Sequence, residues 1–131
     1  MSGHLLVVDD AADIRLLVGT VLRDAGFTVT IANGGQEALD VLREGPRPDA
    51  VVLDVQMPGI DGWTVLRELR SADDPPPVVM CTVKAGDADR ALATSLGAEA
   101  FLTKPFRLAD LVATVRRLVG LPAAPMDGAL L

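Results

Sequence analysis

Five short apolar runs alternate along the chain with longer segments in which apolar residues recur every three or four positions. The runs are Leu5–Val8, Thr28–Ala32, Ala50–Leu53, Val78–Thr82 and Ala100–Thr103. Four of them are almost unbroken in Val, Leu, Met, Ala or Phe, without the alternation of a sheet that has one face in water. The pattern predicts strands of a parallel sheet covered on both faces.

The segments between the runs predict helices, each with one buried stripe. The expected stripes are Ile14, Leu17, Val18, Val21 and Leu22; Ala38, Val41 and Leu42; Gly62, Val65, Leu66 and Leu69; Ala88, Ala91 and Leu92; and Leu108, Leu111, Val112 and Val115. Glycine and proline clusters separate these segments from the runs. A strand and a helix that alternate five times predict a doubly wound (βα)5 domain of the α/β class.

Composition and charge limit the number of domains, the possible ligands and the cellular compartment. The 131 residues fit one domain, and 18 acidic against 12 basic residues give a net charge of −6, which argues against binding nucleic acid. The single cysteine, Cys81, excludes a disulfide within the chain and a zinc cluster, and it fits a reducing compartment. No apolar run approaches the roughly 18 residues of a membrane span, and residues 1–4 lack the features of a secretory signal. We expect a cytoplasmic protein that does not bind membranes.

The helical pattern stops after Val119. We therefore predict one domain over residues 1–119 and a tail over residues 120–131. The tail contains two prolines and no helical stripe, so it is either a frayed end or the beginning of a linker, and the frayed end is favoured.

Polar residues follow four of the five runs at the point where each expected strand ends. They are Asp9 and Asp10, Asp54, Thr82 and Lys104. Parallel strands end at one edge of a sheet, where ligands of open α/β folds bind. Clustered carboxylates repel one another unless a cation is present, and their oxygens suit Mg²⁺. The lysine ammonium suits a phosphate oxygen as a partner, so this set predicts a phosphoryl-transfer site. A carboxylate would act as the nucleophile and form an acyl phosphate.

These residues also carry a family resemblance. Residues 5–10 with Ile14-Arg15, residues 51–62, Thr82, and Lys104-Pro105-Phe106 resemble the motifs of bacterial response-regulator receiver domains in order and spacing. The resemblance covers residues 5 to about 119. It implies a CheY-like, flavodoxin-like fold with five parallel strands in the order 2-1-3-4-5, and a cis Lys104–Pro105 peptide.

The resemblance also implies roles in the chemistry. Asp54 would accept a phosphoryl group from a phosphohistidine, on a sensor histidine kinase or a histidine phosphotransfer protein. Asp10 would bind Mg²⁺ directly and Asp9 mainly through water, with Asp54 and the main-chain carbonyl of Gln56 as further ligands. Lys104 would pair with the phosphoryl group. The domain would catalyse only its own phosphorylation and dephosphorylation, which makes it a signalling domain and no enzyme in the usual sense.

Switching and tuning are implied in the same way. The Thr82 hydroxyl would move towards the phosphoryl group and Phe101 would turn inward, which changes the face presented to a downstream effector or output domain. A homodimer through the last helices is a further partner that the family allows. Val83 is larger than the usual Ala or Gly of the family, and with Gln56 and Lys84 it stands where the family tunes dephosphorylation. We expect Val83 and Lys84 to screen the acyl phosphate from water.

Each residue taken alone has a simpler explanation. Asp10 could cap a helix, Asp54 could belong to a turn, and Lys104 could be a solvated surface charge. Thr82 could be a plain strand end and Phe101 a core aromatic. The convergence of these side chains at one edge favours the functional reading.

Two other functions compete with the receiver. One is a scaffold that uses the fold without phosphorylation, which only Val83 favours. The other is a metal-dependent phosphatase of the haloacid-dehalogenase kind, which needs a second aspartate two residues after the nucleophile. Gln56 stands at that position and cannot transfer a proton.

Overall fold

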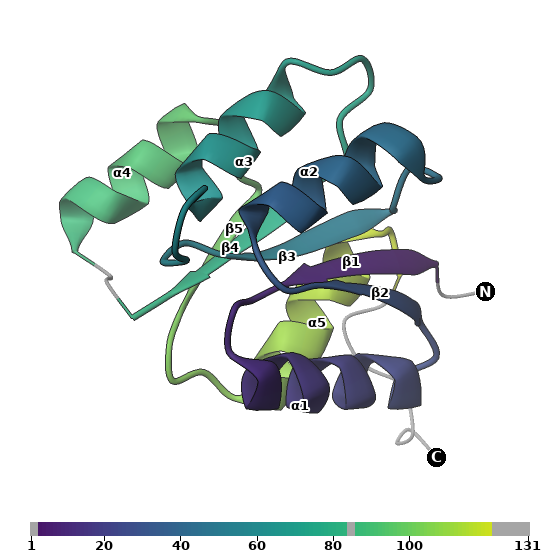
Figure 1. The fold of residues 1–131 in the computed structure, drawn as a ribbon. Coiled ribbons are helices and arrows are strands. Elements are labelled where there is room, and N and C mark those ends of the chain that lie inside the picture. Colours follow the sequence, from purple (N-terminus) through teal and green to yellow (C-terminus); the bar gives the residue numbers. More distant parts are fainter. Residues whose placement is uncertain (1–2, 84–85, 122–131) are drawn as a thin grey trace.

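Five parallel strands form a single twisted sheet in the order β2-β1-β3-β4-β5, with helices on both faces (Figure 1). The computed structural model describes residues 3–83 and 86–121. The strands are β1 (His4–Val8), β2 (Thr28–Ala32), β3 (Ala50–Asp54), β4 (Val78–Thr82) and β5 (Ala100–Thr103). The helices are α1 (Ala12–Asp24), α2 (Gly35–Glu44), α3 (Gly62–Arg70), α4 (Asp87–Ser95) and α5 (Leu108–Leu118).

The structure confirms the expected fold class and strand order. The strands differ from the predicted runs by one residue at most, because β1 begins at His4 and β3 ends at Asp54. Strands β3 and β4 are buried over their whole length, as expected for strands covered on both faces. The Lys104–Pro105 peptide is cis, as the resemblance implied.

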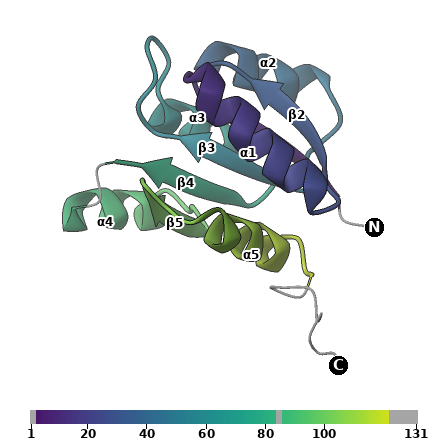
Figure 2. The same ribbon diagram turned by 90° about the horizontal axis from the view of Figure 1, so that it is seen from below.

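The sheet separates two apolar layers. Helices α2, α3 and α4 cover one face, and α1 and α5 lie together on the other (Figures 1 and 2). Leu6, Leu53 and Met80 point into the first layer, while Leu5, Val52 and Cys81 point into the second. Neighbouring residues of each central strand therefore serve opposite faces, which holds the strand ends in place between the layers.

Two of the predicted stripes are partly wrong. In α4, Ala88 and Ala91 are exposed and Ala93 is buried, because this helix contacts the core through Ala93 and the adjoining Leu96. In α1, Leu17 is 48% exposed although Val18 and Leu22 are buried. The helical period fits either choice of face, so packing against the sheet decides which one is buried. The stripe of α3 is buried in full, as predicted.

Within residues 3–83 and 86–121, no helix combines the length and the apolar character needed to cross a membrane. The last helix, α5, ends at Leu118, one residue before the predicted domain boundary. Most of the predicted tail, residues 122–131, lies outside the described residues.

Candidate functional site

The side chains predicted to act together come from the ends of four strands. We call this the carboxyl edge of the sheet. Strands β1, β3 and β4 are neighbours there: Val8 pairs with Leu53, and Asp54 pairs with Cys81. Thr82 pairs with Thr103, the residue before Lys104, and the Lys104 N–H donates to the Thr82 carbonyl at 2.8 Å. Parallel pairing therefore brings these positions together before any loop conformation is considered.

Lys104 lies between two aspartates. Its Nζ donates to Asp9 Oδ2 at 2.9 Å and to Asp54 Oδ1 at 3.3 Å. Both carboxylates are buried, with side chains 8% and 7% exposed, whereas the lysine side chain is 20% exposed. The second oxygen of Asp9 accepts the Ala11 N–H at 2.9 Å. The Lys104 ammonium, just after β5, thus joins the residue that follows β1 to the last residue of β3.

Asp10 completes an acidic cluster that could hold a metal ion. One carboxylate oxygen from each of Asp9, Asp10 and Asp54 lies within 4.8 Å of the other two. Helix α1 begins at Ala12 without a side-chain cap hydrogen bond, so the capping explanation of Asp10 is wrong. Three carboxylates with Lys104 leave a net charge of −2. Because all three ligands are hard oxygens and Asp10 is exposed, the donor set fits Mg²⁺ that keeps several waters.

The electrostatics follow from this crowding. Burial raises the pKa of Asp54 above 3.8, and the neighbouring Asp9 charge raises it further, while Lys104 opposes both. Burial alone would lower the pKa of Lys104, but the hydrogen bonds and charges of Asp9 and Asp54 raise it above 10.5. Lys104 therefore stays charged at neutral pH. Burial raises the pKa of the Cys81 thiol to about 12, so this thiol stays protonated.

The other predicted site residues surround this centre at different depths. Thr82 is buried at the end of β4, and the next residue, Val83, is 61% exposed. Val83 lines an apolar groove of about 490 Å³ that contains Leu17 and reaches Lys104. Phe101 is half-buried, and its ring centroid lies 4.9 Å from the Arg90 guanidinium carbon. Lys84 lies outside the described residues.

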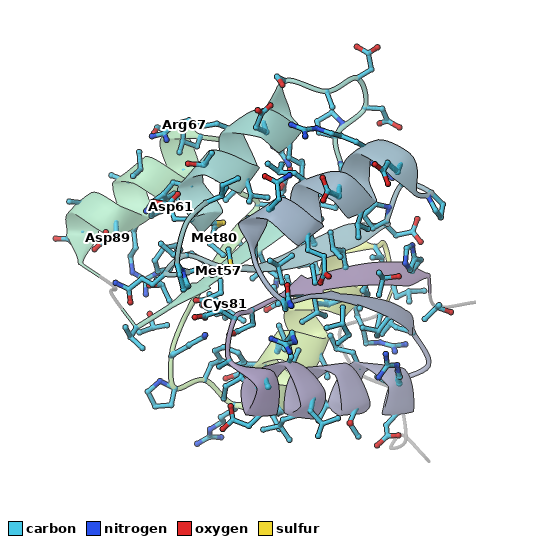
Figure 3. All side chains as sticks on the ribbon, in the orientation of Figure 1. Met57, Asp61, Arg67, Met80, Cys81 and Asp89 are labelled. Atoms are coloured by element: carbon cyan, nitrogen blue, oxygen red, sulfur yellow. The ribbon has the colours of Figure 1, made fainter. Side chains whose placement is uncertain are left out.

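Residues 55–61 connect β3 to α3 and carry Gln56, whose side chain is exposed. This loop, with Trp63 and Asp89, lines a second groove of about 520 Å³. Figure 3 labels Met57, Met80 and Cys81 in the interior near the end of β4, and Asp61 and Asp89 farther out. Asp61 caps α3 by accepting the Thr64 N–H at 3.0 Å, as expected of a residue at a helix start.

Two residues contact the site in ways that the sequence reasoning missed. Gly62, assigned only to the α3 stripe, packs directly against the main chain of Asp54. Arg15, noted only as part of a motif, donates from Nη1 to the Asp9 carbonyl at 2.8 Å. A glycine within an otherwise buried helical stripe is a signal of close backbone approach and could have identified Gly62. No comparable pattern marks Arg15.

Comparisons with known proteins agree with this geometry. The profile of the response regulator receiver domain matches residues 5–116. The response regulator MprA of Mycolicibacterium vanbaalenii is 41% identical over 129 residues, which cover 98% of this chain and 55% of that protein. The chain therefore spans about half the length of the curated relatives it matches.

Solved structures give the same result. The receiver domain of the Francisella response regulator 1452 superimposes with a TM-score of 0.85 at 29% identity, covering 89% of this chain and 96% of that one. The receiver domain of sensor histidine kinase PA1611 from Pseudomonas aeruginosa gives 0.82 at 28% identity, covering 92% and 99%. That structure has a magnesium ion coordinated in its active-site cleft. From the profile match and the fold, we conclude that this chain belongs to the response regulator receiver domain family, a class of signalling domains of two-component systems.

Proposed function

We propose that this chain is a phosphorylatable receiver that accepts a phosphoryl group on Asp54 with the help of Mg²⁺. The observation that carries the proposal is the position of Lys104, within hydrogen-bond distance of both Asp9 and Asp54. Beside an anionic oxygen cluster, this ammonium stands where it can neutralise a phosphoryl oxygen. A purely structural aspartate would not need two further carboxylates beside it.

The chemical step is a transfer between two nucleophiles. A carboxylate oxygen of Asp54 attacks phosphorus, so that a P–O bond forms as the P–N bond of a phosphohistidine breaks. The electron pair of the broken bond remains on the imidazole nitrogen, and the product is an acyl phosphate. Lys104 neutralises charge on the phosphoryl oxygens, and the hydroxyl of Thr82 donates to one of them. The phosphohistidine belongs to a sensor histidine kinase or a histidine phosphotransfer protein.

Asp10 and Asp54 would hold Mg²⁺ directly, with Asp9 acting mainly through water and the Gln56 carbonyl as the remaining ligand. The ion supplies charge neutralisation for the carboxylates and the incoming phosphoryl group. The support for this assignment is the all-oxygen donor set and its excess of negative charge.

The phosphoryl group would then act as a switch. Phosphorylation changes the charge at Asp54 from −1 to about −2 and adds three phosphoryl oxygens. This group draws the Thr82 hydroxyl inward, Phe101 follows, and the face made by α4, β5 and α5 changes. A downstream effector or output domain reads that face, and a second copy of the chain is an alternative partner. Residues 1–119 form the switching unit, residues 120–131 are a tail or the start of a linker, and the domain acts in the cytoplasm.

Val83 and Lys84 are proposed to lengthen the life of the acyl phosphate. The support is that Val83 is exposed in the groove that reaches Lys104, where it can limit the approach of water. We expect Val83→Ala and Lys84→Glu to shorten the lifetime several-fold in a hydrolysis time course. Unchanged lifetimes in both variants would exclude this role.

The main proposal is tested with acetyl phosphate as a small phosphodonor. The protein is incubated with this donor and Mg²⁺, and its intact mass is measured over time. We expect the gain of one phosphoryl group, no gain in EDTA, and no gain in Asp54→Asn. Asp61→Asn is the matched control, because Asp61 lies in the adjoining loop and caps α3, a role that asparagine also performs.

Each alternative gives a different result. A phosphatase would release inorganic phosphate over many turnovers without a stable mass gain, and a scaffold would neither gain mass nor release phosphate. Either outcome would rule out the receiver function.

A further inference from the structure

The first residue of α3 leaves no space between that helix and the phosphoryl acceptor. A Cβ atom built on Gly62 would lie 2.2 Å from the main-chain oxygen of Asp54 and 2.8 Å from the Cα of Val55. Both atoms belong to the main chain, so no side-chain rotation can relieve the overlap. The absence of a side chain at position 62 therefore fixes how closely α3 approaches the end of β3.

The main chain beyond Asp54 is held from both sides. The Gly62 N–H donates to the Val55 carbonyl at 2.9 Å, and the Val55 N–H donates to the Cys81 carbonyl at 3.2 Å. Val55 is buried and lies between Asp54 and Gln56. A shift of this short segment would therefore change the position of the Asp54 carboxylate relative to Lys104, and would move the Gln56 carbonyl with it.

Other glycines of the molecule are not equivalent. Gly59, in the same loop, has a φ of +75° but no atom within 4 Å of a built Cβ, so its glycine serves the backbone conformation alone. At position 62, by contrast, glycine is required because a Cβ atom would collide with the main chain of Asp54 and Val55. This difference provides a matched pair of substitutions.

We propose that Gly62 is a positioning residue for phosphoryl transfer: it sets the place of the Asp54 carboxylate and the Gln56 carbonyl through a main-chain contact that any side chain would displace. This inference rests on the proposed function. A displacement of about 1 Å at a reacting group can lower a rate by about a hundredfold, so the effect should be large. The sheet itself does not depend on this contact and should persist in a variant.

The test compares Gly62→Ala with Gly59→Ala in the full chain. Trp63 is the only tryptophan and lines the groove that contains Gln56, so its fluorescence should report Mg²⁺ binding. The rise in unfolding temperature with Mg²⁺ gives a second measure of affinity. The initial rate of phosphorylation by acetyl phosphate is measured on the same samples, after circular dichroism has confirmed the fold.

We expect Gly62→Ala to fold, to bind Mg²⁺ at least fivefold more weakly, and to react at least tenfold more slowly. Gly59→Ala should lose stability, because Ala is strained at positive φ, yet keep both properties within about threefold. The proposal is wrong if Gly62→Ala matches the wild type, if Gly59→Ala loses as much, or if Gly62→Ala does not fold. Should the wild type itself take up no phosphoryl group, the proposed function fails, while the Mg²⁺ affinities still decide the role of Gly62.

Discussion

The two ends of the sheet both contain partly buried charges, but they are arranged differently. At the carboxyl edge, Lys104 serves Asp9 and Asp54, with Asp10 close by. At the opposite end, which we call the amino edge, Arg70 pairs one to one with Glu99 at 3.1 Å. The cluster at the first end keeps a surplus of negative charge, whereas the Arg70–Glu99 pair is neutral.

The main-chain hydrogen bonds of the Arg70–Glu99 pair indicate a structural role. Arg70 also donates to the Pro76 carbonyl at 2.7 Å, and Glu99 accepts the Val78 N–H at 2.8 Å. These bonds tie the end of α3 to the beginnings of β4 and β5. A charge-balanced ion pair that also bonds the main chain stabilises the fold. A cluster of buried carboxylates with excess negative charge destabilises it unless a cation binds there, so such a cluster indicates a functional site.

The largest effect is expected from removing the ammonium group of Lys104 at the carboxyl edge. Lys104→Ala should slow phosphorylation about a hundredfold, because one preorganised charge that stabilises a transition state contributes 10²–10³ in rate. Initial rates with acetyl phosphate at saturating Mg²⁺ measure the change. A rate within threefold of the wild type would show that Lys104 only neutralises the resting carboxylates.

Breaking the amino edge should affect stability alone. Arg70→Ala is expected to lower the free energy of unfolding by about 2 kcal/mol, because hydrogen bonds to charged groups contribute about 1.5–3 kcal/mol. Urea denaturation measures this loss. The phosphorylation rate of the folded variant should equal that of the wild type. A slower rate at full folding would mean that the two edges are coupled.

Removing one charge at the carboxyl edge should stabilise the protein. Because the pKa of Asp54 is raised by folding, its ionised form opposes folding. Its favourable contribution is complete below the unfolded value of about 3.8 and is lost as pH rises through the folded pKa. We expect Asp54→Asn to increase the free energy of unfolding at pH 7 by on the order of 1 kcal/mol. The gain should disappear near pH 3.5. Urea titrations in EDTA at the two pH values measure it, and a less stable Asn variant at pH 7 would contradict the charge surplus.

The smallest effect concerns the rim of the carboxyl edge. Arg90 lies over the ring of Phe101 and donates to Thr103 Oγ1 at 3.1 Å, but it is exposed. Arg90→Ala should therefore cost only about 0.5–1 kcal/mol of stability and leave the initial phosphorylation rate unchanged. Thermal unfolding measures the first quantity. A loss of stability above about 2 kcal/mol would contradict this expectation and would show that Arg90 stabilises the fold as Arg70 does.

The positions of the strands, and of the residues that follow them, could be predicted from the sequence. Strands covered on both faces leave continuous apolar runs, so β3 and β4 could be located to within one residue. The meeting of Asp9 and Asp54 follows from parallel pairing, because β1 and β3 are neighbouring parallel strands. Lys104 follows β5 at the same edge, and its long side chain spans the intervening strand β4 to reach both carboxylates.

Contacts that depend on how closely two elements approach could not be predicted. The Arg70–Glu99 pair joins residues 29 positions apart that carry no motif. The glycine at position 62 signals a close approach, but which main chain it approaches depends on distances of a few ångströms. The buried stripe predicted for α4 is partly wrong, since alanines on both sides of the helix make its apolar period ambiguous. Distances of this kind arise from packing, which a one-dimensional pattern does not encode.

The first residue of β1, His4, limits the possible sources of a phosphoryl group in the proposed function. His4 is the only imidazole in these 131 residues, and its Nε2 is hydrogen-bonded to Thr30 Oγ1 at 2.7 Å. It begins a five-residue strand whose far end adjoins Asp9, which places it about 16 Å from the acceptor at 3.3 Å per residue. His4 is therefore too far from Asp54 to pass a phosphoryl group to it, so a phosphohistidine that serves the proposed acceptor would belong to a separate polypeptide region.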